Sequence, residues 1–151
     1  MSNVKDIDRG LKKFIRQLQY AKEVEVVIGV QEGEENDEGI SIAEYAAANE
    51  YGTKRIPSRP FMATAFDENS DKISRSIARH YGAVKRGAST VYDALGRIGQ
   101  SHRKDIQTTI SKRDFLPALS PKTIKAKRGS TKTLIDTGAL INSINYKIRK
   151  G

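Results

Sequence analysis

The sequence contains no cysteine, which excludes disulfide bonds, thiolate metal sites and a cysteine nucleophile and is typical of a chain made in a reducing cytoplasm. It also lacks any apolar run of transmembrane length. Residues 1–6 have no apolar core behind a basic start, so we expect no signal peptide. The pattern G-x-x-x-x-G-K-[ST] is missing, which argues against a P-loop nucleotide-binding enzyme.

Apolar residues are scarce. They make up 37% of the 151 residues, whereas charged residues make up 30%. This length fits one domain, and the composition allows only a modest core, part of which neighbouring copies can complete. We therefore predict a single domain over residues 1–151, without an internal repeat.

Charge is divided unevenly between the two halves of the chain. Residues 1–75 carry 11 Lys and Arg against 14 Asp and Glu, a net charge of −3. Residues 76–151 carry 16 against 4, a net charge of +12, and the total is +9. A basic half indicates a polyanion or an acidic partner surface, and the split suits copies that pack head to tail. A solvated lysine-rich surface is an equally good interpretation of the composition.

Hydrophobic periodicity predicts both helices and strands. Steps of three and four residues predict a helix over 4–20 and long helical sequence over 61–110, which glycines break into two helices near 82–87. Strict alternation predicts strands over 23–30 and 143–149, and their pairing would join the ends of the domain.

Capping signals and prolines place the remaining elements. Ser41 opens an S-x-x-E capping box, which predicts a helix to about Tyr51 that ends at Gly52. We expect Pro60 at the first position of the next helix, and a short helix from Pro121 capped by Ser120. We expect a flexible acidic loop over 31–39, a basic loop over 111–133 and a turn over 134–140.

The expected fold class follows from these elements. It is α+β, with a small antiparallel sheet packed against an N-terminal helix and one or two long central helices, with extended loops.

One stretch looks catalytic. Residues 134–139, LIDTGA, resemble the active-site turn of retroviral-type aspartic proteases, in which two aspartates share one proton and a dimer can supply the second. However, only 13 residues follow Gly138, too few for the rest of such a barrel. The favoured interpretation is a structural turn, in which Asp136 and Thr137 act as turn or cap residues and Gly138 supplies a special backbone angle. A dimeric protease is the weaker alternative.

Other chemistry is poorly supported. His80 and His102 have no His or Glu partner at helical spacing, so we expect surface positions for both, no metal site and no cofactor. Five cations of the basic loop are candidate contacts to DNA or to an acidic partner: Lys122, Lys125, Lys127, Arg128 and Lys132. No aromatic residue lies among them to stack on a base, so such contact would be non-specific and salt-sensitive. A basic, non-specific nucleic-acid-binding domain is therefore the alternative function.

Two sets of motifs, in order, resemble the signature of neck and tail-completion proteins of tailed bacteriophages. ANEYGT (48–53) and IPSRPFM (56–62) are similar to the family's NE-[FY]-GT … IP-x-RPF-[LM]. LSPKTI (119–124) and KTLIDTGALINSI (132–144) are similar to its L-[AS]-P-x-T … K-P-LIDTG-x-L-x-x-SI, and IGV (28–30) ends a strand like its V-x-VGV. The chain departs from the family at ATAF (63–66), where Arg-Pro often precedes the Ala, at Ile141 and at Thr133.

This resemblance implies a virion structural protein without catalysis, cofactor or membrane contact. Family members are called tail-completion, head–tail joining or minor tail proteins. They form an α+β ring, typically a hexamer, between the head-side connector or stopper and the tail terminator or tube, and genomic DNA passes through the lumen. The chain would then be assembled in the host bacterial cytoplasm and reside in the neck of the virion.

The resemblance also suggests interface residues. They are the motif residues Tyr51, Gly52, Thr53, Arg59, Pro60 and Phe61. Arg and aromatic side chains are favoured at interfaces, and the prolines make this corner rigid. Plain core packing is the equal alternative for Phe61.

Overall fold

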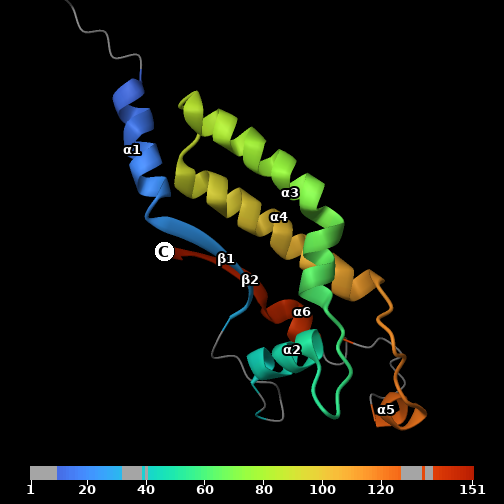
Figure 1. Cartoon of the computed structure of the whole chain (residues 1–151). Helices are drawn as coiled ribbons and strands as arrows, with labels where there is room; N and C mark the ends of the chain where they lie inside the picture. Colours follow the sequence, from blue (N-terminus) through green and yellow to red (C-terminus); the bar gives the residue numbers. More distant parts are fainter. Residues whose placement is uncertain (1–9, 32–38, 40, 127–133, 135–137) are drawn as a thin grey trace, which may run out of the picture.

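The computed structural model describes residues 10–31, 39, 41–126, 134 and 138–151. The elements are α1 (Leu11–Ala21), β1 (Val24–Val30), α2 (Ile42–Tyr51), α3 (Phe61–Lys85), α4 (Val91–Lys112), α5 (Pro121–Ala126), α6 (Ala139–Ser143) and β2 (Ile144–Lys150). Figure 1 shows α3 and α4 as a long helical hairpin, with the two strands lying beside α4. The α+β class predicted from the sequence, with its small antiparallel sheet and long central helices, is confirmed.

The sheet joins the beginning and the end of the described chain, as predicted. β1 and β2 pair antiparallel from Val24 opposite Lys150 to Val30 opposite Ile144. One face of this strand pair packs on α4. Helix α4 also packs against α3, so it contacts both the sheet and the other long helix. The other face of the sheet carries an exposed ion pair of 2.9 Å between Glu25 Oε1 and Arg149 Nε.

The contact between α4 and the sheet is very close at Gly99. A Cβ atom at this position would lie 2.6 Å from Cδ2 of Tyr146 and 3.0 Å from Cγ2 of Val26. A glycine therefore lets the helix approach one tyrosine and one valine that face it from the two strands.

Helix α1 begins at Leu11, later than the sequence predicted. Gly10 has a φ of 102°, in the left-handed region, so the right-handed helix cannot pass through it. The expectation of one helix over 4–20 that runs through Gly10 is therefore wrong, and residues 4–9 of that predicted helix lie outside the described residues.

The predicted helix ends are confirmed at α2 and between α3 and α4. The Ser41 hydroxyl accepts a 3.4 Å hydrogen bond from the amide of Glu44, and α2 ends at Tyr51 before Gly52, whose φ is 77°. The break expected near 82–87 lies at 86–90. Thr90 begins α4 by accepting a 3.1 Å hydrogen bond from the amide of Asp93.

The C-terminal third differs from the prediction in two places. Helix α4 continues to Lys112, so the basic loop begins at 113 and not at 111. Residues 139–143 form the short helix α6, which replaces the end of the predicted turn and moves the start of the strand to Ile144. The short helix from Pro121 is confirmed, and the amide of Thr123 donates to the hydroxyl of Ser120 at 3.2 Å. Most of the predicted acidic loop, residues 32–38, lies outside the described residues.

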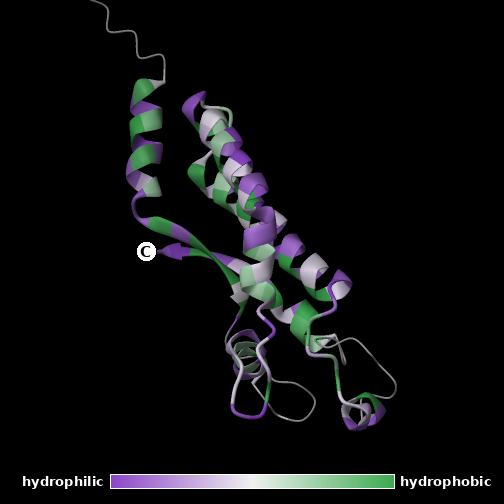
Figure 2. Cartoon of the chain, turned by 45° about the vertical axis from the view of Figure 1, so that its right-hand side comes forward, coloured by the Kyte–Doolittle hydropathy of each residue, from purple (hydrophilic) through white to green (hydrophobic). Residues whose placement is uncertain are grey.

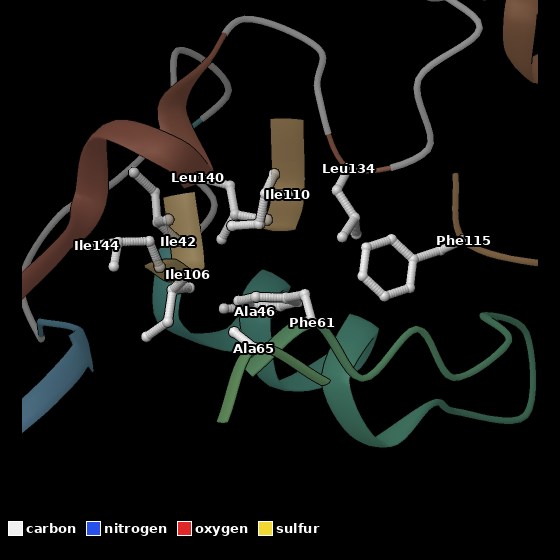
Figure 3. Close-up of a cluster of buried hydrophobic side chains, with 10 residues drawn as sticks. All are labelled: Ile42, Ala46, Phe61, Ala65, Ile106, Ile110, Phe115, Leu134, Leu140 and Ile144. Atoms are coloured by element: carbon white, nitrogen blue, oxygen red, sulfur yellow. The ribbon is translucent and has the colours of Figure 1, made fainter. Parts of the chain in front are cut away.

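The core gathers side chains from distant parts of the chain (Figure 3). Its members are Ile42, Ala46, Phe61, Ala65, Ile106, Ile110, Phe115, Leu134, Leu140 and Ile144. They come from α2, α3, α4, α6, β2 and the segments around Phe115 and Leu134. Among the described residues, no helix is both long and apolar enough to span a bilayer.

Two glycines in α4 allow a matched test of this packing. Gly96→Ala should raise the free energy of unfolding by up to about 1 kcal/mol, because alanine favours a helix and the new Cβ would lie 4.0 Å from the Tyr146 hydroxyl. Gly99→Ala should lower it by about 1–3 kcal/mol, because its Cβ would overlap the ring of Tyr146. Urea unfolding curves measure both changes. Equal effects of the two substitutions would contradict the close approach at Gly99.

Candidate functional site: the motif corner and the surfaces around it

The first family-like motif forms a corner that links α2 to α3 through its own hydrogen bonds. The amide of Arg59 donates to the carbonyl of Asn49 at 2.6 Å, and the hydroxyl of Ser58 donates to the carbonyl of Glu50 at 2.8 Å. Between these contacts, the hydroxyl of Thr53 accepts from the amide of Ile56 at 2.9 Å. The loop is therefore folded back on the end of α2.

Gly52 is required by this close return. Its φ is 77°, and a Cβ atom there would lie 2.9 Å from the backbone nitrogen of Ser58. Any other residue would meet both a strained backbone and a steric clash with backbone atoms.

The carboxylate of Glu50 caps the N-terminus of α3. Its two oxygens accept hydrogen bonds of 2.9 Å from the amides of Met62 and Ala63. These amides have no partner within a helix, and a carboxylate also interacts favourably with the positive end of the helix dipole. Glu50 is buried, so this carboxylate holds the end of α2 against the start of α3.

Pro60 occupies the N-cap position of α3, whereas the sequence predicted it at the first helical position. Its φ of −74° and ψ of 74° form an inverse γ-turn, in which the amide of Phe61 donates to the carbonyl of Arg59 at 2.8 Å. Proline offers no side-chain cap, which explains why Glu50 is needed.

Arg59 and Phe61 lie inside the subunit. Phe61 is 0% exposed and belongs to the core, and Arg59 is 6% exposed. One nitrogen of the Arg59 guanidinium, Nη2, donates to the carbonyl of Pro117 at 3.0 Å. The Nε atom is buried without a hydrogen-bond partner among the described residues. The expectation that both side chains face a partner is therefore corrected, and core packing is the role of Phe61.

Other motif residues stay on the surface. Tyr51, the last residue of α2, is 83% exposed, and Thr53 and Pro60 of the following loop are exposed as well. Lys54 and Arg55 are exposed in the same loop. Since an aromatic ring and two cations protrude here, the loop offers a contact surface that no described part of the chain covers.

The second motif contributes to the same core. Leu134 and Leu140 are buried together with Phe61, and Gly138 has the predicted special conformation with a φ of 83°. Asp136 and Thr137 lie outside the described residues. The strand that follows this motif pairs with β1 in a two-stranded sheet.

The candidate cations are only partly described. Lys122 and Lys125 are exposed on α5, which Figures 1 and 2 draw apart from the helical hairpin. Lys127, Arg128 and Lys132 lie outside the described residues.

A polar groove of about 370 Å³ runs between α3 and α4. Its lining residues are Glu68, Asn69, Asp105, Thr108, Thr109, Lys112 and Arg113. Two ion pairs cross between the helices here, Lys72 with Asp105 and Arg113 with Glu68. Within the described ranges, no cluster of three or more His, Asp or Glu side chains could hold a metal ion.

His102 lies beside this groove and is more buried than the sequence predicted. Its side chain is 13% exposed, Nδ1 lies 4.0 Å from Oδ2 of Asp105, and the ring of Phe66 packs edge-on at 6.1 Å between centroids. Burial lowers the pKa of His102 from its ordinary 6.5, and Lys72 adds to this lowering, while Asp105 opposes it.

Sequence reasoning missed Glu50 as a cap and His102 as a buried side chain. The proline at the N-cap of α3 was the available signal for the first, because it shows that a cap must come from elsewhere. No local pattern marked the second.

Glu50→Gln should lower the free energy of unfolding by about 1–2 kcal/mol, because a charge-assisted cap of two amides is replaced by a neutral one. Glu44→Gln is the matched control, since Glu44 is an exposed glutamate in the first turn of α2, and should cost about 0.5 kcal/mol or less. Thermal or urea unfolding compares them. Equal losses would contradict the capping role.

The lowered pKa of His102 predicts a pH dependence. The unfolded chain binds the proton more tightly, so this contribution to stability is fully present above pH 6.5 and is lost as the pH falls toward the folded pKa. His102→Asn should flatten the dependence of unfolding free energy on pH between about 7.5 and 5.5. Urea unfolding at several pH values measures the slope. An unchanged slope in the variant would count against the burial of a neutral imidazole.

The chain matches no protein-family model, no curated protein and no solved structure.

Proposed function

We propose that this protein is a virion structural protein of a tailed bacteriophage, which forms a ring in the neck and joins the head connector to the tail. The observation that carries this proposal is the convergence of the two family-like motifs. Phe61 of the first motif and Leu134, Leu140 and Ile144 of the second pack in one core, although more than 70 residues separate them in the chain.

The roles of the motif residues support the proposal. Gly52, Glu50, Arg59 and Phe61 each make a contact that their residue type alone provides well: a tight return, a helix cap, a bridge to Pro117 and a filled core. If the short motifs matched by chance, we would not expect all four residues to make structural contacts at the same corner between α2 and α3. The resemblance is thus consistent with the way in which the chain folds.

The exposed residues suit a subunit of an assembly. Tyr51, at the end of α2, and Leu116, which is 80% exposed, are large exposed side chains near the segments that the hydrogen bond from Arg59 to Pro117 connects. Exposed aromatic and aliphatic residues of this kind typically fill pockets of a partner. In this proposal they contact the head-side connector or stopper, or the tail terminator or tube.

DNA is the proposed partner of the basic half. Lys122 and Lys125 project from α5, and phosphate contact through lysine requires no base-stacking side chain. The ring, for which the resemblance suggests six copies, would be built in the host bacterial cytoplasm, and it needs neither catalysis nor a cofactor.

The test uses the phage or prophage that encodes the chain. A null mutant should release DNA-filled heads and separate tails, visible by electron microscopy, and wild-type protein supplied in trans should restore infectious particles. Normal virions that form without the protein would overturn the proposal.

A pair of variants sharpens this test. Tyr51→Asp should lower the titre of complemented phage by at least about tenfold, since removal of an interface aromatic commonly costs about 1.4 kcal/mol or more. Gln100→Asp changes an exposed residue of α4, away from this loop in sequence, and should leave the titre unchanged. Circular dichroism checks that both variants fold.

A further inference from the structure

Helix α1 carries an apolar stripe that the described part of the chain leaves largely uncovered. Leu11, Ile15 and Leu18 follow one another at steps of four and three residues, which places them on one face of the helix. They are 65%, 43% and 38% exposed, and no side chain of α1 is buried among the described residues. Figure 2 shows the hydrophobic bands along this helix.

Side chains along one edge of this stripe hold α1 against the rest of the subunit. Gln17 accepts a 2.7 Å hydrogen bond from the amide of Val91, and Phe14 is half-buried. Phe14 and Gln17 also line a cavity of about 330 Å³ together with Leu11 and Val84. Since Phe14 and Gln17 anchor the helix, Ile15, Leu18 and the exposed part of Leu11 are available for another contact.

Helix α3 carries a second apolar stripe. Phe66, Ile73, Ile77 and Tyr81 recur at helical spacing over about 22 Å of the helix. Phe66, Ile77 and Tyr81 are each about half exposed. An exposed row of this length on a long helix is an unusual surface for a subunit that works alone.

The charges beside the two stripes have opposite signs. Lys12 and Arg16 lie one residue after Leu11 and Ile15, and α1 contains no acidic residue. Asp67 and Asp71 lie in the corresponding position beside Phe66, and both are exposed without an ion pair to a described residue. Because both pairs lie on the same side of their stripes and are four residues apart, antiparallel packing of the two helices brings cation beside anion.

We propose that the α1 stripe of one copy packs antiparallel on the α3 stripe of the next copy of this chain. Leu18 then lies beside Phe66, Lys12 faces Asp71 and Arg16 faces Asp67. This inference rests on the proposed ring and specifies the contact between its neighbouring subunits. Each copy uses both stripes once, so the contact repeats from copy to copy and can close into a ring.

Cysteine cross-linking tests the contact directly, because the chain has no cysteine of its own. The double variant Leu18→Cys/Phe66→Cys should form disulfides between copies on mild oxidation and give a ladder of linked species up to the full ring. The control Leu18→Cys/Gln100→Cys, with the second thiol on an exposed position of α4, should give no ladder.

Charge reversal provides an independent readout. Arg16→Glu should reduce the cross-linked yield by at least about tenfold, and adding Asp67→Arg on the same chain should restore it, because the pair is then re-formed with its signs exchanged. A fold defect would not be rescued in this way. Failure of the second substitution to restore the yield, with both variants folded, overturns the proposal.

The cross-linking is carried out on the purified protein at high concentration and on complemented virions. If the protein is present in normal virions but neither preparation gives the ladder, or if the links stop at dimers, the proposed contact is wrong while the neck function stands. If the protein is absent from normal virions, the neck function fails. If virions with the Leu18→Cys/Phe66→Cys variant give the ladder and those with the control variant do not, the result supports both the proposed contact and the neck function.

Discussion

The fold depends on the cover that α4 gives to a two-stranded sheet, because two strands alone are at best marginally stable in water. Gly99 allows the helix backbone to approach the ring of Tyr146 and the side chain of Val26. Helix α3 in turn packs along α4 and is held by ion pairs such as that of Lys72 with Asp105. The pairing of β1 with β2 then connects the N-terminal half of the chain to its last residues.

The motif corner adds the second constraint. Glu50 binds α2 to α3, and Arg59 binds the corner to the loop at Pro117, so three segments of the chain are held around Phe61. A family-like motif therefore acts here mainly through the fold. The residues that the same corner leaves exposed, above all Tyr51, are the ones available to partners.

The surface has features that one isolated subunit does not use. Apolar rows on α1 and α3 are exposed, and charges of opposite sign accompany them. Contacts between different surfaces of identical subunits produce rings or filaments, whereas contacts of one surface with itself produce dimers. The opposite charges beside the two rows favour contact between different surfaces, as the proposed ring in a phage neck requires.

The sequence by itself determined the features that depend on neighbours a few residues away. The cap at Ser41, the helix at Pro121, the alternating strands and the backbone of Gly138 all follow from local sterics and hydrogen bonding. Only the tertiary structure decided that Glu50 caps the amide of Met62, 12 residues later, that Arg59 is buried against Pro117, 58 residues away, and that His102 is shielded from water. These contacts depend on how the helices pack, which no short pattern of residues encodes.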